Sequence, residues 1–221
     1  MKKHILITAL SVLALNVFAQ KKIEVRESNE KIGNGNNNAL SVMIYVEDAD
    51  LVEKAWKSKL KDMDAKVSTK DGIFGDDAKL KAMGPNTFDV YSRVEVVKGE
   101  GIKLIVGVDL GGAFLSSSQH SEQFKVFKGI LYEFAVKITK DKIGDELSVQ
   151  EKALDKLNDQ QKDLEKENKD LKNDIEDYKK KIAEAEDKIK KNEENQKTKK
   201  SEIEAQQKVV GGVKEKLNAV K

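Results

Sequence analysis

The residues of this chain best suited to chemistry stand in the segment LSSSQHSEQF, where His120 lies among the serines Ser116, Ser117, Ser118 and Ser121. Asp109 lies just upstream, so the parts of a hydrolytic Ser-His-Asp triad are present. Triad members are rarely neighbours in sequence, however, and the GxSxG pattern of a nucleophile elbow is missing. Serines ahead of a helical stretch are ordinary caps, so we expect capping here, with anion binding at the helix start as the alternative.

Metal and nucleotide chemistry have less support in the sequence. There is no Cys and, beyond His4, only one His, so a zinc site lacks ligands. The acidic stretch DGIFGDD (71–77) lacks the alternating oxygen ligands and final Glu of a calcium loop. Gly111 and Gly112 do not follow the GxGxxG spacing of a dinucleotide site. We therefore expect no cofactor and no metal.

Period-two alternation of apolar and polar residues marks three segments, 40–46, 88–96 and 102–110, as strands with one buried face. Ser92 is the one polar member of its apolar face. The link KGEG (98–101) predicts a hairpin between the last two segments. A further strand is expected at 23–26, followed by a turn-rich connection through IGNGNNNAL, because Gly and Asn tolerate left-handed backbone angles.

Two helices are expected to cover the apolar face of this sheet. One spans about 50–63, where Asp50 and Glu53 have capping-box spacing and apolar residues recur every three to four positions. The other begins between Ser118 and Ser121 and carries a stripe of Phe, Leu and Ile. Trp56 and Tyr91 could belong to a binding face, but core positions are expected for them. Residues 66–83 suggest short strands broken at Gly72 and Gly75.

These elements predict an α+β class: a small antiparallel sheet with helices on one face over residues 20–145, followed by a long α-helical coiled coil. Before them, residues 1–19 combine Lys2 and Lys3, an apolar run and small residues, which is typical of a secretory signal peptide. The run is too short to span a bilayer. We therefore expect an exported protein of the periplasm or cell envelope, without a transmembrane span once the signal is removed.

The net charge of the whole chain argues against electrostatically driven binding to nucleic acid or to anionic lipid. The chain has 41 basic and 39 acidic residues, and removing Lys2 and Lys3 leaves 39 of each. Neutral proteins gain little from electrostatic attraction to polyanions. We expect no nucleic-acid binding.

The tail from residue 146 onward repeats apolar residues at spacing seven, in two series three residues apart that occupy the a and d positions of a coiled coil. There is no Gly or Pro between residues 145 and 210. A helix with so narrow an apolar stripe needs a partner helix. We expect a coiled-coil helix at 146–210, a break at Gly211 and Gly212, and a short terminal helical segment at 211–221.

Asn168 occupies an a position, in a series whose members are mostly Leu, Ile or Val. A buried Asn at such a position can bond its symmetry mate and penalise shifted or antiparallel alignments. The flanking g and e positions also match in a parallel pair: Glu167 with Lys172, Asp174 with Lys179, Lys181 with Glu186, and Lys188 with Glu193. Both features predict a parallel homodimer, although a trimer stays possible.

The expected oligomerisation residues fall into two groups. The first, which we call the seam, holds Leu154, Leu157, Leu164, Asn168, Leu171, Ile175, Tyr178, Ile182 and Ile189. The second, which we call the flanks, holds Glu167, Lys172, Asp174, Lys179, Lys181, Glu186, Lys188 and Glu193. One alternative is a solvated single helix, in which Asn168 and Gln161 only mark a weak seam. The other is an intrachain hairpin that turns within residues 190–200, although the seven-residue phase continues across that polar stretch.

The block FDVYSRV (88–94) and the segment VGVDLGGAFLSSSQHSEQF (106–124) resemble a part of uncharacterised exported proteins of Gram-negative bacteria. Those proteins likewise join a small domain to a charged coiled-coil tail. The resemblance implies the same architecture and brings no activity with it.

Two functions remain open from the sequence. The first is a non-enzymatic interaction or structural protein, in which a coiled coil presents the α+β domain to an envelope protein or component. The alternative is a small-ligand-binding or unrecognised enzymatic domain on a helical stalk.

Overall fold

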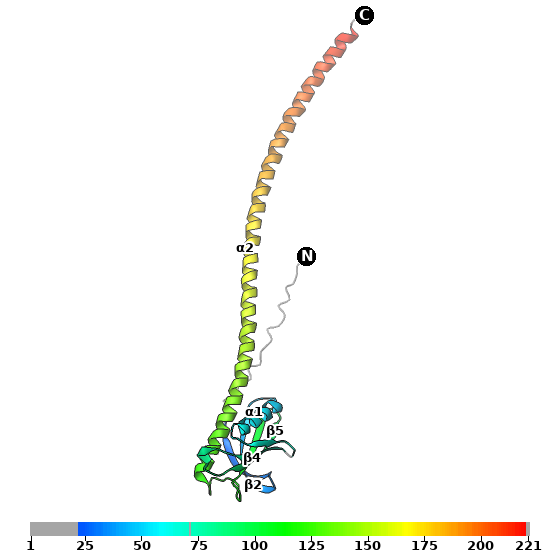
Figure 1. The fold of residues 1–221 in the computed structure, drawn as a ribbon. Coiled ribbons are helices and arrows are strands. Elements are labelled where there is room, and N and C mark those ends of the chain that lie inside the picture. Colours follow the sequence, from blue (N-terminus) through cyan, green and yellow to red (C-terminus); the bar gives the residue numbers. More distant parts are fainter. Residues whose placement is uncertain (1–21, 71, 220–221) are drawn as a thin grey trace. The chain divides into compact units, whose positions relative to one another are not determined.

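The computed structural model describes residues 22–70 and 72–219, so the expected signal peptide at 1–19 lies outside the described residues. The chain divides into two compact units between Val149 and Gln150. Along the chain the elements are β1 (Val25–Ile32), β2 (Gly35–Ile44), α1 (Ala49–Lys61), β3 (Lys66–Ser68), β4 (Ile73–Ala78), the 3-10 turn η1 (Lys81–Met83), β5 (Phe88–Val97), β6 (Gly101–Asp109) and α2 (Ser121–Asn218) (Figure 1).

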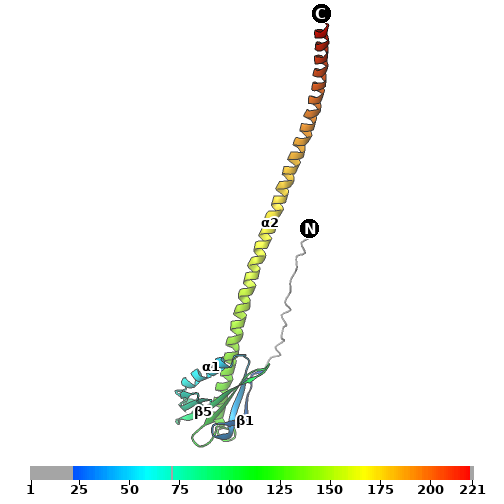
Figure 2. The ribbon, with the colours of Figure 1, turned by 90° about the vertical axis from the view of Figure 1, so that its right-hand side faces the viewer.

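The first unit is built on one six-stranded antiparallel sheet in the order β1-β2-β6-β5-β4-β3 (Figure 2). The three strands expected from period-two alternation correspond to β2, β5 and β6. The hairpin at KGEG is confirmed, since the backbone N–H of Glu100 donates to the carbonyl of Val97 at 2.9 Å. The α+β class is therefore confirmed, with a long helix following the sheet.

The connection between β1 and β2 differs from the expectation. Most of the Gly- and Asn-rich run lies within β2 and pairs with β1, and the turn is confined to Gly33 and Asn34. Side-chain bonds explain why asparagines are stable in this strand. Asn37 Nδ2 donates to the carbonyl of Ile32 at 2.8 Å, and Asn38 Nδ2 donates to the carbonyl of Leu115 at 2.7 Å.

The start of α1 also differs, because Asp48 rather than Asp50 is its N-cap. The Asp48 carboxylate accepts from the N–H of Leu51 at 3.2 Å, which satisfies one of the first unpaired donors of the helix. Further along, Gly75 lies within β4 and does not break it. A Cβ at Gly75 would come within 3.4 Å of Ala65 and Leu60, so this glycine lets α1 pack closely on the sheet.

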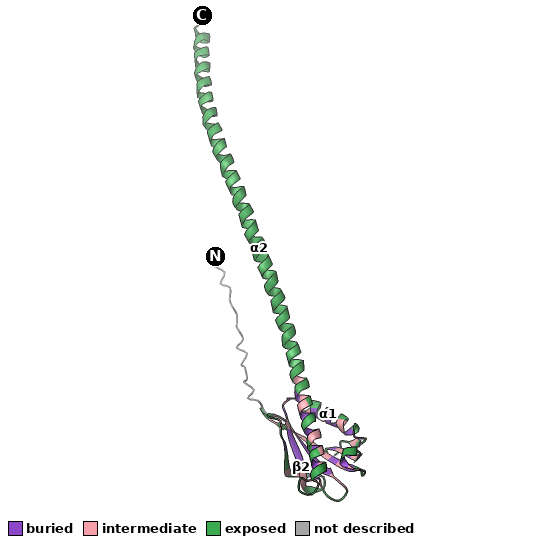
Figure 3. Ribbon diagram, turned by 90° about the vertical axis from the view of Figure 1, so that its left-hand side faces the viewer, coloured by how far each residue is buried: buried purple, intermediate pink, exposed green. Residues whose placement is uncertain are grey.

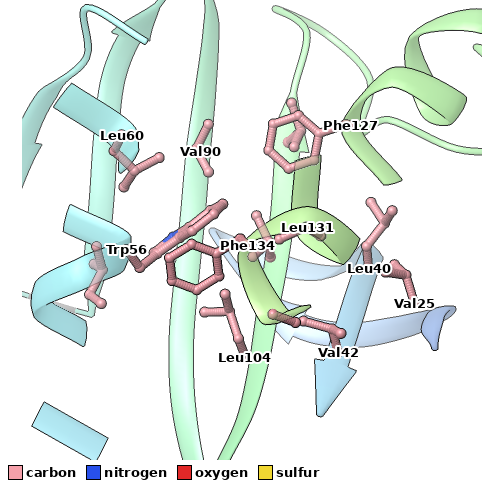
Figure 4. Packing of buried hydrophobic residues seen from close by; sticks show 14 of the residues in the cluster. Val25, Leu40, Val42, Trp56, Leu60, Val90, Leu104, Phe127, Leu131 and Phe134 are labelled. Atoms are coloured by element: carbon pink, nitrogen blue, oxygen red, sulfur yellow. The ribbon is translucent and has the colours of Figure 1, made fainter. Parts of the chain in front are cut away.

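One face of the sheet carries the main core. Trp56 of α1 and Phe134 of α2 meet edge to face over the central strands, with ring centroids 5.0 Å apart (Figure 4). Trp56 Nε1 donates to Ser92 Oγ at 2.8 Å, and both side chains are buried. This bond explains the polar residue on an otherwise apolar strand face, because a buried indole N–H needs an acceptor.

The half of the β1–β2 hairpin nearest its turn bends over the face of the sheet opposite the main core. β2 pairs with β6 only from Leu40 to Ile44, and beyond that point Ile32 packs with Ala39 and Ile105 in a small second cluster. A Cβ at Gly107 of β6 would lie 2.9 Å from Ile32 Cγ2, so only glycine admits this approach.

Beyond the first unit the chain is helical, and every described residue from Ile143 to Ala219 is exposed (Figure 3). α2 continues through residues 190–200 without turning, so the hairpin alternative is not what this chain adopts. It also continues through Gly211 and Gly212, so the expected break is wrong. Each glycine lowers helix stability by only about 1 kcal/mol relative to Ala, which weakens a helix without ending it.

Candidate functional site

The strongest candidate site is the seam, which lies entirely on α2 in the second unit. Its eight apolar members have exposed fractions between 52% for Ile175 and 62% for Leu157. Heptad spacing places them on one side of the helix, because seven residues make nearly two full turns. A stripe of large apolar side chains in water, interrupted here by Gln161, Asn168 and the small Ala185, is typical of an interaction surface.

Local sequence explains why this region is a single helix. Charged pairs three or four residues apart stabilise it along its exposed faces, including Lys179 with Glu176 at 2.7 Å and Lys191 with Asp187 at 3.5 Å. Such exposed pairs contribute only about 0.2–0.5 kcal/mol each. The pairs therefore support the helix but leave its apolar stripe uncovered.

Asn168 lies in the seam between Leu164 and Leu171, where a shallow surface hollow is lined by Gln161, Leu164, Glu165, Asn168, Lys169 and Lys172. Gln161 donates to Glu165 at 2.8 Å along the same helix. Among residues 22–70 and 72–219, no side chain forms a hydrogen bond with the amide of Asn168. The amide is thus available to a group supplied from outside this helix.

The flanks border the seam on both sides. Within the described part of the chain, no ion pair joins one flank residue to another. Lys179 instead contacts Glu176, and Lys181 Nζ lies 5.6 Å from the ring centroid of Tyr178. The g and e positions of one helix lie on opposite sides of its seam, so the expected pairings require a second helix.

The sheet domain does not assemble the hydrolytic group considered from sequence. His120 Nδ1 accepts a 3.4 Å bond from the backbone N–H of Ser116, and the backbone N–H of His120 donates to the carbonyl of Ser116. Asp109 accepts from the backbone N–H groups of Gly111 and Gly112 at 2.9 and 3.2 Å. These residues shape the turns that lead into α2.

In the acidic stretch at 71–77, the described carboxylates Asp76 and Asp77 both contact a lysine. Asp71 lies outside the described residues, and Lys66 pairs with Asp76 and Asp77 at 3.9 and 3.3 Å. Over the described residues, no group of three or more His, Cys, Asp or Glu side chains could hold a metal ion.

The sequence analysis did not predict a cluster of charged side chains, which we call the clasp, on the face of the sheet opposite the main core. Arg93 of β5 donates to Glu30 at 2.7 Å, to the carbonyl of Lys31 at 2.6 Å and to Glu95 at 2.8 Å, and Lys103 lies 3.7 Å from Glu30. Two strands separate β1 from β5 in the sheet, so these bonds hold the bent hairpin in place. Alternation predicted that Arg93, Glu95 and Lys103 share a face, but Glu30 lies beyond the strand expected at 23–26, and only the bend of the hairpin brings it to them.

Glu30 is the electrostatic centre of this clasp. Burial alone would raise the pKa of Glu30, but hydrogen bonds from Ser28 and Arg93, with the charges of Lys103 and Arg93, outweigh burial and lower it. The pKa of Glu27 is lowered in the same way, against burial, by bonds from Ser117 and Asn38. Both carboxylates are therefore structural anions.

Tyr91 lies on the same face of the sheet as the clasp and is half-buried rather than part of the main core. Its ring lies between Phe74 and Phe114, with centroid distances of 4.8 and 6.0 Å. Burial, together with Asp89, Asp109 and Asp76, raises the pKa of Tyr91. This phenol therefore stays protonated at physiological pH.

None of the described helices has an apolar stretch that is long enough to cross a membrane. Comparison with known protein families, characterised proteins and solved structures returns no match for this chain.

Proposed function

We propose that this chain is an exported, non-enzymatic interaction protein of the periplasm or cell envelope. The seam pairs in parallel with that of a second copy, and the homodimer presents two sheet domains to an envelope protein or component. Bivalent presentation raises avidity without strengthening either single contact. The resemblance to exported bacterial proteins with coiled-coil tails agrees with this architecture but carries no activity.

The observation that carries the proposal is an exposed apolar seam with charge-matched flanks. In a parallel pair, each of the four flank pairings brings opposite charges together, whereas a single helix leaves them apart. Asn168 adds a selective element, since its amide would meet the same amide of the partner helix.

The test is sedimentation of residues 20–221 beside residues 20–149 across a concentration series. We expect the longer chain to have twice the monomer mass and the shorter chain to be a monomer. A monomer for both at every concentration would refute the pairing.

Asn168→Leu sharpens this test. Replacing the amide by an apolar side chain should stabilise the assembly while allowing trimers or tetramers beside the dimer. A strictly dimeric variant would show that Asn168 does not select the oligomeric state.

A further inference from the structure

The last part of α2 differs in charge from the part that carries the seam. We call residues 197–219 the distal segment. Residues 150–196 hold 12 Lys and 15 acidic residues, whereas the distal segment holds six Lys and three Glu. The two stretches therefore carry net charges of −3 and +3.

The charge pattern that favours self-pairing also ends before the distal segment. The next g and e positions would pair Asn195 with Lys200, Glu202 with Gln207, and Val209 with Lys214 in a parallel dimer. None of these joins opposite charges. The distal segment is therefore not specified for another copy of itself in the way that the flanks are.

Apolar side chains nevertheless remain exposed along the distal segment. Ile203, Val209, Val210, Val213 and Leu217 have exposed fractions between 44% and 73%. At about 100° per residue they lie within an arc of roughly 120° on the helix, which they share with Lys199, Glu202 and Gln206. Val209 widens this arc, because it stands at a g position where the flanks carry charge.

Lysines border this apolar arc. On the same helical projection Lys214 and Lys216 lie about 20° beyond its two edges. Long lysine side chains at such positions can reach anionic groups while their stems lie along apolar surface. An aliphatic face edged by lysines is the pattern of helices that lie at a membrane interface.

We propose that the distal segment docks on the anionic phospholipid surface of the cell envelope. Its aliphatic arc enters the boundary between headgroups and acyl chains, and Lys214 and Lys216 contact lipid phosphates. This inference depends on the export included in the proposed function but not on the pairing of the seam.

Two observations favour lipid over other anionic partners. The distal segment has no Trp, Tyr, Phe or Arg, the side chains that dominate protein interfaces. Its exposed aliphatic arc is also unsuited to a hydrophilic anionic polymer, which offers no apolar phase to bury it.

Gly211 and Gly212 weaken this part of the helix, which docking on a membrane surface would stabilise. Both lie outside the apolar arc, and a Cβ at either would meet no atom within 4 Å. Packing does not require glycine here, yet two adjacent glycines reduce the intrinsic stability of the helix. Docking should therefore increase the helical content of the distal segment.

The test is co-sedimentation of residues 20–221 with vesicles of phosphatidylglycerol and, separately, of phosphatidylcholine. We expect binding to the anionic vesicles, weakened by added salt, and little binding to the zwitterionic ones. Lys214→Glu with Lys216→Glu should weaken binding more than tenfold, since each lysine near an anionic surface contributes about fivefold. The charge-matched control, Lys152→Glu with Lys156→Glu, should bind as the parent does.

A second pair of variants tests the apolar arc. Val209→Ser should weaken vesicle binding roughly fivefold, by removing an apolar side chain from the arc. Ala153→Ser, at the same heptad position in the N-terminal part of the second unit, should leave binding unchanged. Equal losses for the two variants would refute a role for the arc.

Sedimentation of the same preparations separates this inference from the proposed function. A dimer that binds neither kind of vesicle would overturn the docking and leave the pairing intact. A monomer that binds phosphatidylglycerol vesicles would overturn the pairing and leave the docking intact. Binding to polyglutamate without binding to vesicles would overturn lipid docking and indicate an acidic protein as partner.

Discussion

The two units of this chain differ in whether their apolar side chains are buried. In the sheet domain Trp56 is fully buried, and its one polar atom is bonded to Ser92. In the second unit Leu157 and Ile182 are more than half exposed. The first unit therefore buries its apolar side chains in its own core, while the second leaves an apolar stripe exposed.

α2 contains both buried and exposed apolar side chains. Its early residues Phe124, Phe127, Leu131 and Phe134 are buried against the sheet, whereas none of its described residues beyond Ile143 is buried. Ala135 and Thr139 are buried beside this stripe, so the face on the sheet is broader than the two-position heptad stripe of the seam, which has the width that another helix covers. The width of an apolar stripe thus indicates whether it packs on a sheet or on another helix.

The largest effect should come from breaking the sheet domain alone. Phe134→Ala removes the ring that packs on Trp56 and should lower the free energy of unfolding of this domain by about 3–5 kcal/mol. Urea unfolding followed by fluorescence of Trp56, the only tryptophan, measures this directly. Tyr132→Ala, on the exposed side of the same helix turn, is the control and should cost far less. Similar losses for both would contradict the core assignment.

An intermediate effect should come from breaking the second unit alone. Asp174→Lys turns two attractive flank pairings of the dimer into repulsive ones and should weaken dimerisation by about 1–2 kcal/mol, or roughly tenfold in the dissociation constant. Adding Lys179→Asp should restore most of the affinity. Sedimentation equilibrium gives both constants, and Trp56 fluorescence should report an unchanged sheet domain. Failure of the double variant to recover would argue against a parallel, in-register pair.

The smallest effect should appear in the pH dependence of the sheet domain. The pKa of Glu30 is lowered in the folded state, so its carboxylate stabilises the domain at pH values above the ordinary pKa of Glu, and this contribution is lost as the pH falls through the folded-state pKa. Glu30→Gln should therefore be less stable than the parent at pH 7, by about 1 kcal/mol, and the difference should shrink in acid. Urea unfolding of the parent and the variant, at pH 7 and in acid, provides the measurement. Asn29→Gln, an exposed change on the same strand, is the control, and a pH-independent difference for Glu30→Gln would disprove the clasp.

Local pattern was sufficient to predict most of the sheet domain. Alternation identified β2, β5 and β6, and KGEG marked their hairpin, because a half-buried strand needs one apolar face. It failed for the Asn-rich half of β2, where the carbonyls of Ile32 and Leu115 satisfy the side chains of Asn37 and Asn38. Leu115 is distant in sequence, so no local signal could reveal that bond.

The candidate site shows the same division between local and distant information. The helical seam could be predicted because heptad spacing is a local property, and Gly211 and Gly212 misled only because helix propensity is a weak constraint. The Arg93 clasp could not be predicted, since it joins β1 and β5 across two intervening strands. The partner of the seam lies outside the chain altogether and stays a prediction.

The unbroken seven-residue phase of the second unit constrains how its length can change over evolution. Deleting a single residue would rotate every later side chain by about 100° and move Ile175 and Ile182 off the stripe. Deleting seven would shorten the helix by only about 10 Å and keep the stripe in line. Length variation among descendants of this sequence is therefore expected to occur in whole heptads.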